Sequence, residues 1–187
     1  MYDFVDQKRV VYITLAIILL ISAVIAPVAI FYPLKAAFIT PAAEAIGTSY
    51  VSMITGGAGI ALLAVGLIIL AILEMRLKKY LLSGVLFFAG IFGIALSLGD
   101  YYYMTTEQFT YNAPFSFEEQ NFTWQDFEKI EEYIGTKDGV NSLESVILYP
   151  KDGDAIEMSS GQILQMSGSI VNRIENAGGQ YERISSN

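Results

Sequence analysis

Three long apolar stretches dominate the first half of the chain, and none of them contains a charged residue. They run over residues 10–32, 51–73 and 80–98. A helix needs about 20 consecutive, mostly apolar residues to cross the roughly 30 Å hydrocarbon layer of a bilayer. A buried helix of this length in a soluble protein would carry charge on one face. The pattern therefore predicts a three-helix transmembrane domain within residues 10–99.

The first apolar stretch could be mistaken for a secretory signal peptide. Its apolar run is longer than the roughly 7–15 residues of a signal sequence. Pro27 directly follows Ala26, the residue that would otherwise suit cleavage. We therefore expect this stretch to be retained as the first span, with Pro27 producing a kink.

The second half of the chain has a shorter pattern, typical of a small α+β domain. Alternating polar and apolar positions predict strands over residues 107–111 and 115–119, joined by a proline-containing turn. Thr123 and Asp126 have the spacing of a capping box, so we expect a helix over residues 124–134. The apolar residues at helical intervals in this segment are Trp124, Phe127, Ile130 and Ile134.

The last third of the chain predicts a hairpin, a helix and a final strand. Residues 145–149 and 155–158 read as strands on either side of an Asp-Gly pair, which favours a tight turn. A helix is expected over residues 159–177, where a Gly-Gly pair ends it. Residues 180–184 follow as a last strand.

Charge is divided unevenly between the two halves. Residues 1–99 carry six basic and four acidic residues, a net charge of +2, whereas residues 100–187 carry five basic and fifteen acidic residues, a net charge of −10. An acidic surface repels phosphates, so we expect no nucleic-acid partner. The chain has no cysteine and no histidine. These absences remove disulfides, thiolate chemistry, and the commonest general base and metal ligand.

The basic residues also predict the orientation of the spans, because Lys and Arg near span ends stay in the cytoplasm. The cytoplasmic segments are then the N-terminus (residues 1–9) and the loop at residues 74–79, which together hold Lys8, Arg9, Arg76, Lys78 and Lys79. The loop at residues 33–50 holds only Lys35 and is expected outside. We interpret it as a simple connector, although residues 34–46 also suit a short amphipathic helix. Three crossings place residues 100–187 outside the cytoplasm.

Two groups of residues are candidates for packing or binding. Small residues recur every four positions on the second and third spans, a spacing that lets two helices approach closely. They are Gly57, Ala61, Ala89, Gly93 and Ser97. On the predicted helix in residues 124–134, Glu128, Glu131 and Glu132 form an acidic face that is either simply solvated or binds a basic partner. We expect no catalytic, cofactor-binding or metal-binding residues.

Residues 122–130, with the sequence FTWQDFEKI, resemble the aromatic-Trp-acid-apolar signature of bacterial pleckstrin-homology-like domains. In that family the signature precedes a strand hairpin with a Lys-Asp-Gly turn, here residues 146–158, and a closing helix, here residues 161–177. The resemblance covers residues 117–178, about a third of the chain. It implies a binding or assembly module, and it implies that residues 124–132 are partly strand. Such domains usually face the cytoplasm, opposite to the side that the charges predict.

The sequence thus predicts an α-helical membrane protein with three transmembrane helices and a small C-terminal α+β extracytoplasmic domain. The spans contain no ionisable residue of the kind that lines ion and proton pathways. We expect a non-enzymatic, multi-pass protein of the cell membrane that acts as an accessory, regulatory or sensory subunit. Its partners are the lipid bilayer and either a protein or surface partner or further copies of itself. The alternative is a small pore or a subunit of a membrane transporter.

Overall fold

The computed structural model describes residues 7–39, 43–116, 118–137, 140–159 and 162–185. Contacts divide the chain into two compact units. The helical unit comprises Met1–Pro33 and Val51–Gly99, and the sheet unit comprises Leu34–Tyr50 and Asp100–Asn187. The chain therefore passes between the units three times, and the segment between the first two apolar helices belongs to the sheet unit.

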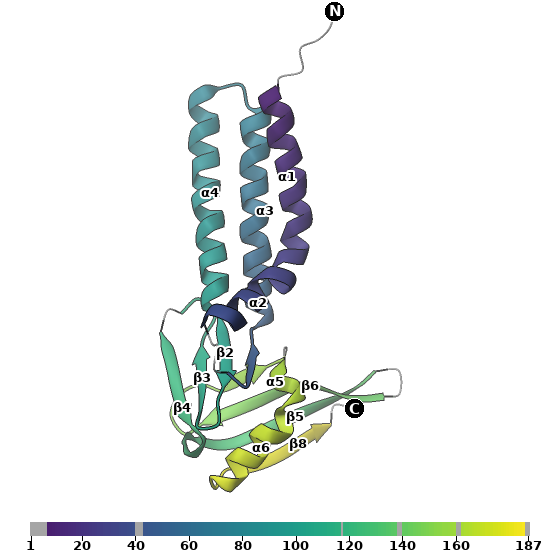
Figure 1. Cartoon of the computed structure of the whole chain (residues 1–187), viewed down its shortest axis with the longest axis vertical. Helices are drawn as coiled ribbons and strands as arrows, with labels where there is room; N and C mark the ends of the chain where they lie inside the picture. Colours follow the sequence, from purple (N-terminus) through teal and green to yellow (C-terminus); the bar gives the residue numbers. More distant parts are fainter. Residues whose placement is uncertain (1–6, 40–42, 117, 138–139, 160–161, 186–187) are drawn as a thin grey trace, which may run out of the picture. The chain divides into compact units, whose positions relative to one another are not determined.

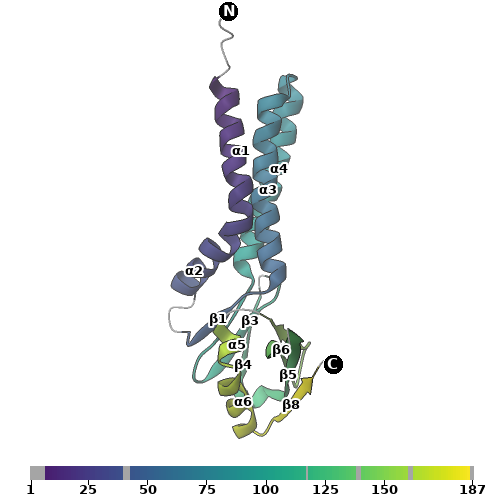
Figure 2. The ribbon, with the colours of Figure 1, turned by 90° about the vertical axis from the view of Figure 1, so that its right-hand side faces the viewer.

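The helical unit confirms three helices that are long and apolar enough to cross a membrane. They lie side by side in Figures 1 and 2. The first begins as α1 (Gln7–Ala26) and continues through a π-helical turn (Pro27–Phe31), the short α2 (Tyr32–Leu34) and a second π-helical turn (Lys35–Ile39). The π-helical turn starts at Pro27, because proline has no N–H to donate to the preceding turn. The other two helices are α3 (Tyr50–Ile72) and α4 (Arg76–Gly99).

A seam of small residues joins the antiparallel helices α3 and α4. Ideal Cβ atoms built on Gly59 and Gly90 would each lie 2.7 Å from the carbonyl oxygen of the other glycine. At one end, the Oγ atoms of Ser52 and Ser97 donate to each other's carbonyl oxygens at 2.6 and 2.7 Å. At the other end, the Oγ of Ser83 donates to the Gly66 carbonyl oxygen at 3.0 Å. The contacting residues are seven apart on both helices, the spacing that keeps one seam in contact.

The five small residues expected to pack occupy three different environments. Gly93 and Ser97 lie against α3, and Gly57 lies against Ala23 of α1. Ala61 is half-buried, and Ala89 is exposed. The tightest contact between α3 and α4, that of Gly59 with Gly90, belongs to the seven-residue repeat and lies outside the expected set.

The sheet unit contains two four-stranded sheets. The first has the order β1-β2-β3-β4 and is antiparallel throughout. The second has the order β7-β6-β5-β8, with β8 parallel to β5 and the other pairs antiparallel. The strands are β1 (Ala45–Gly47), β2 (Tyr101–Met104), β3 (Gln108–Asn112), β4 (Glu119–Thr123), β5 (Phe127–Lys137), β6 (Val140–Pro150), β7 (Ile156–Met158) and β8 (Gln180–Ser185).

A single hydrophobic core joins both sheets and two helices, α5 (Gln162–Gln165) and α6 (Ser167–Asn176). Figure 2 shows α6 beside β5 and β8. The fully buried side chains of this core include Tyr102, Phe109, Phe127, Ile130, Leu148, Ile163, Ile170 and Ile174. The predicted strands at 107–111, 145–149, 155–158 and 180–184 each correspond to an observed strand.

The predicted helix over residues 124–134 is wrong, and its capping box explains part of the error. The Thr123 N–H and hydroxyl both donate to Asp126 Oδ2 at 2.7 Å, but they cap only one 3-10 turn, Trp124–Asp126. The chain then continues as β5. A bulge at Glu128 places Phe127 and Ile130, three residues apart, on the same buried side. This bulge produces the spacing that resembles a helix.

Three smaller differences have local causes. The second predicted strand lies at Glu119–Thr123, because a turn follows β3 and Phe115 adopts a positive φ of 62°. The loop at 33–50 holds helical residues up to Ile39 and the strand β1, so it is not a simple connector. Residues 160–161 of the helix expected over 159–177 lie outside the described residues. From Gln162 onward the helix is divided at Met166, whose φ of −102° and ψ of 12° interrupt it.

Candidate binding surface of the second sheet

On the face of the second sheet that points away from the core, the carboxylate of Glu131 accepts hydrogen bonds from three side chains. Glu131 as a whole residue is only 7% exposed. Lys129 Nζ donates to Oε1 at 2.6 Å, while the phenols of Tyr133 and Tyr149 donate to Oε2 at 3.0 and 2.8 Å. Because one carboxylate accepts all three donors, the two tyrosine rings are held in fixed positions.

The strand register identifies the other members of this face. Lys129, Glu131 and Tyr133 alternate along β5, and their cross-strand partners on β6 and β8 point the same way. We define the tyrosine face as Lys129, Glu131, Tyr133, Ile147, Tyr149, Glu182 and Ile184. Lys129 also pairs with Glu182 at 2.5 Å, so polar contacts join β5, β6 and β8 across the face. Ile147 and Ile184 are half-buried and leave apolar surface between the polar groups.

The electrostatics of the tyrosine face favour an ionised Glu131. The hydrogen bond from Lys129 and those from the two phenols lower the pKa of Glu131. The same hydrogen bonds raise the pKa of Lys129 and raise the pKa of Tyr149 to about 12. Both tyrosines therefore remain neutral hydrogen-bond donors at physiological pH.

Glu132, the next residue, points to the opposite side of the sheet. It is 4% exposed and accepts hydrogen bonds from Tyr181 at 2.8 Å and from Arg183 at 2.9 Å. Burial raises the pKa of Glu132, but the hydrogen bonds from Arg183, Tyr181 and Ser167 outweigh it, so its pKa is lowered overall.

The three glutamates of the expected acidic face therefore do not share a surface. Glu131 and Glu132 lie on opposite sides of β5 because successive strand residues alternate. Glu128 is exposed at the bulge. Only a helix would have placed these three glutamates on one face, whereas the strand separates them.

A second polar site, the connector clamp, consists of Lys35, Thr48, Ser49 and Asp100. Lys35 is 1% exposed, and its Nζ donates to Thr48 Oγ1 at 2.7 Å and to the Asp100 carbonyl oxygen at 2.5 Å. Thr48 donates to the same carbonyl at 3.0 Å, and Ser49 donates to the Asp100 carboxylate. Each of these residues lies within two positions of a point where the chain passes between the units.

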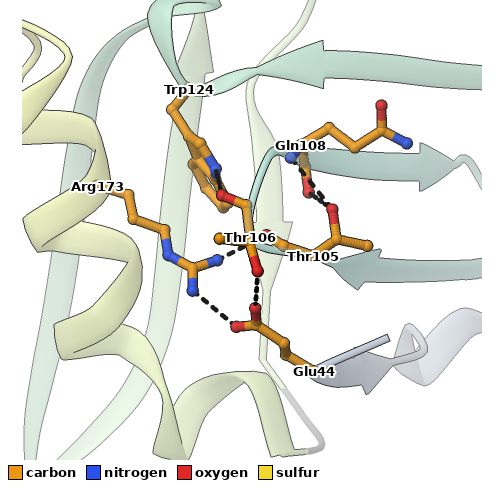
Figure 3. Close-up of polar contacts among 6 residues, drawn as sticks. All are labelled: Glu44, Thr105, Thr106, Gln108, Trp124 and Arg173. Carbon is orange, nitrogen blue, oxygen red and sulfur yellow. Dashed lines mark hydrogen bonds and ion pairs between the residues drawn. The ribbon is translucent and has the colours of Figure 1, made fainter. Parts of the chain in front are cut away.

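A third site joins α6 to the first sheet, as Figure 3 shows. Arg173 donates to the Thr105 carbonyl oxygen at 2.6 Å and to Glu44 Oε2 at 2.7 Å. Thr106 donates to the other oxygen of Glu44 at 2.6 Å, and Trp124 Nε1 donates to the Thr106 carbonyl oxygen at 3.0 Å. The Arg173 guanidinium lies 5.3 Å from the centre of the Trp124 ring. These contacts connect α6 to Glu44 and to the residues between β2 and β3, and they describe a structural junction.

Comparisons with protein-family models, with curated proteins and with solved structures find no match to this chain. The similarity of residues 117–178 to pleckstrin-homology-like domains therefore remains a resemblance. Its expectation that residues 124–132 are partly strand agrees with β5, and a hairpin and helix follow in the expected order.

Sequence reasoning missed the tyrosine face and the connector clamp. The alternation of Lys129, Glu131 and Tyr133 indicates a strand with these residues on one face, and so could have identified the tyrosine face. The same segment was instead predicted to be a helix. The clamp joins residues up to 65 positions apart, and no local pattern connects them. Lys35 could be recognised only as the lone base of its loop.

Proposed function

We propose that this chain is a non-enzymatic, membrane-anchored subunit whose sheet unit binds a partner protein through the tyrosine face. The observation that carries the proposal is the arrangement of Tyr133 and Tyr149 around Glu131. Tyrosine offers a large contact area, and ordered rings lose little conformational entropy on binding. The half-buried isoleucines beside them supply the apolar part of such an interface.

The apolar helices support membrane anchoring. Their outward side chains are large and exposed, including Ile21 at 59%, Val24 at 80% and Phe88 at 76%. Contiguous apolar surface of this kind requires lipid or another apolar partner. The distribution of basic residues favours an extracytoplasmic sheet unit, as argued from the sequence.

The charge of the sheet unit specifies the chemistry of the partner. Residues 100–187 carry a net charge of −10, and exposed Glu157 and Glu182 lie at the edges of the tyrosine face. A partner surface with basic residues around an apolar or aromatic centre complements this face. The backbone passes between the two units three times, and the connector clamp lies next to these crossings. Binding of a partner to the sheet unit could therefore influence the helices through the backbone.

Photo-crosslinking in intact cells tests this proposal. A photoreactive residue replaces Glu182 on the tyrosine face or, as the matched control, the exposed Glu175 on α6. We expect a discrete protein adduct from position 182 alone, and we expect Tyr133→Ala with Tyr149→Ala to abolish it. Equal adducts at both positions, or none at position 182, would contradict the proposal. Solute flux through liposomes containing only this chain would favour the pore alternative.

A further inference from the structure

The helical unit contains a cavity of about 700 Å³ at the end where α1 and α4 begin and α3 ends. It lies entirely within that unit. Its basic lining residues are Lys8, Arg9, Arg76 and Lys79. We refer to it as the basic cavity.

The lining combines a cationic group with an apolar surface. Four described lining residues are basic, and Glu74 is the one acid among them, a net charge of +3. Arginine and lysine are the side chains that bind phosphate oxygens, arginine by paired N–H donors and lysine as a point charge. Residues 70–73 provide apolar groups from the last turn of α3 and the following loop.

Aromatic and apolar side chains surround this cationic group. Tyr12 and Tyr80 also line the cavity, and the Lys79 ammonium lies 5.3 Å from the centre of the Tyr80 ring. Leu77 and Leu81, on the first turns of α4, are 81% and 67% exposed. A ligand with a phosphate group and hydrocarbon chains can therefore satisfy the cavity and the adjacent helix surface together.

We propose that the basic cavity binds the phosphate group of an anionic phospholipid. This inference rests on the membrane anchoring proposed above. A basic pocket between helices at one end of a membrane domain is suited to anionic headgroups, because the cations pair with phosphate while acyl chains pack on the helices. A soluble phosphate would use the cations alone and gain nothing from Leu77 and Leu81.

A control variant can match the change in net charge while leaving the cavity lining intact. Arg76→Gln with Lys79→Gln removes two lining cations. Lys78→Gln with Lys151→Gln removes the same charge from residues outside the lining, and Lys78 lies in the first turn of α4, as Arg76 and Lys79 do. Lys8→Gln with Arg9→Gln provides a second cavity variant if the first does not fold.

Native mass spectrometry of the full chain, purified in mild detergent with equal phosphatidylglycerol and phosphatidylcholine, measures the preference directly. We expect wild type and the control to retain phosphatidylglycerol preferentially. Each cation near a membrane surface strengthens the binding of an anionic lipid by about fivefold. The cavity variant lacks two such cations, so its preference for phosphatidylglycerol should fall by roughly 25-fold. No preference in wild type, or equal loss in the control, would overturn the inference.

Two further measurements separate the alternatives. Displacement of bound phosphatidylglycerol by inorganic phosphate at equal concentration would identify a soluble phosphate as the ligand and overturn the lipid assignment. Alkaline extraction of membranes tests the anchoring itself. A chain that resists extraction but shows no lipid preference contradicts the cavity assignment alone, whereas a chain released by extraction contradicts the proposed anchoring.

Discussion

The phenol of Tyr149 donates a 2.8 Å hydrogen bond to Glu131 Oε2, the same oxygen that accepts the phenol of Tyr133 at 3.0 Å. The two tyrosines come from neighbouring strands, and Lys129 occupies the other carboxylate oxygen. Glu131 thus aligns aromatic groups on a face that carries no core residue. The arrangement makes Glu131 a positioning residue for the proposed interface and gives the sheet unit a specific dependence on pH.

We expect acid to destabilise the sheet unit partly through Glu131. Its pKa in the folded chain is lowered from the usual 4.5, so folding favours the ionised form. This contribution is present above the unfolded pKa and is lost as the pH falls through the lowered folded value. Urea unfolding followed by Trp124 fluorescence should show a smaller loss of stability below pH 4.5 in Glu131→Gln than in wild type. Identical pH dependence in both would contradict this account.

The seam between α3 and α4 should not tolerate a methyl group at Gly59 or Gly90. A Cβ at either position meets a backbone oxygen at 2.7 Å, and backbone cannot rotate away. We expect Gly59→Ala to destabilise the helical unit by about 1–3 kcal/mol, measured by circular dichroism during denaturation in detergent. Gly84→Ala on α4 is the control, because a Cβ there has no neighbour within 4 Å. Comparable losses in the two variants would argue against close helix contact.

The junction at Arg173 should contribute measurably to the sheet unit. Arg173→Ala removes hydrogen bonds to Thr105 and Glu44, and hydrogen bonds to charged groups contribute about 1.5–3 kcal/mol. We expect a loss of that order in urea unfolding, together with a change in emission from Trp124, the chain's one tryptophan. Lys151→Ala, at an exposed turn residue, is the matched control and should change neither quantity. An unchanged emission spectrum in Arg173→Ala would show that the guanidinium does not lie over the ring.

The connector clamp should behave as a coupled unit. Asp100→Asn removes the carboxylate charge that favours the buried Lys35 ammonium and weakens the acceptor of Ser49, so we expect this single change to destabilise the sheet unit. Replacing both residues, as in Lys35→Met with Asp100→Asn, should recover part of that loss because no buried charge remains. A double-mutant cycle in denaturant measures the coupling. Additive effects of the two single changes would refute the clamp.

Local patterns in the sequence were sufficient for the elements whose signals depend on neighbouring residues. Uninterrupted apolar runs located the three long helices, and the Asp-Gly pair located the turn between β6 and β7. The segment after Trp124 was misread because its bulge gives Phe127 and Ile130 a helical spacing. No rule based on periodicity distinguishes that spacing from a helix.

The binding surface was harder to predict because it depends on strand register. Glu131 meets Tyr149 only once β5 and β6 are paired, and Glu182 joins them only through the parallel strand β8. The seam of α3 and α4 was accessible in principle. Ser52, Gly59 and Gly66 recur every seven residues, and so do their partners on α4, but a four-residue spacing does not detect this repeat.

Cysteine labelling in intact cells most directly tests the central claim, a membrane-anchored sheet unit outside the cytoplasm. The chain has no native cysteine, so Asp152→Cys, Lys78→Cys and the buried control Ser83→Cys each introduce one thiol. A membrane-impermeant maleimide should label position 152 in intact cells, position 78 only after permeabilisation, and position 83 in neither condition. Labelling of position 78 but not 152 in intact cells would contradict the account and place the tyrosine face in the cytoplasm.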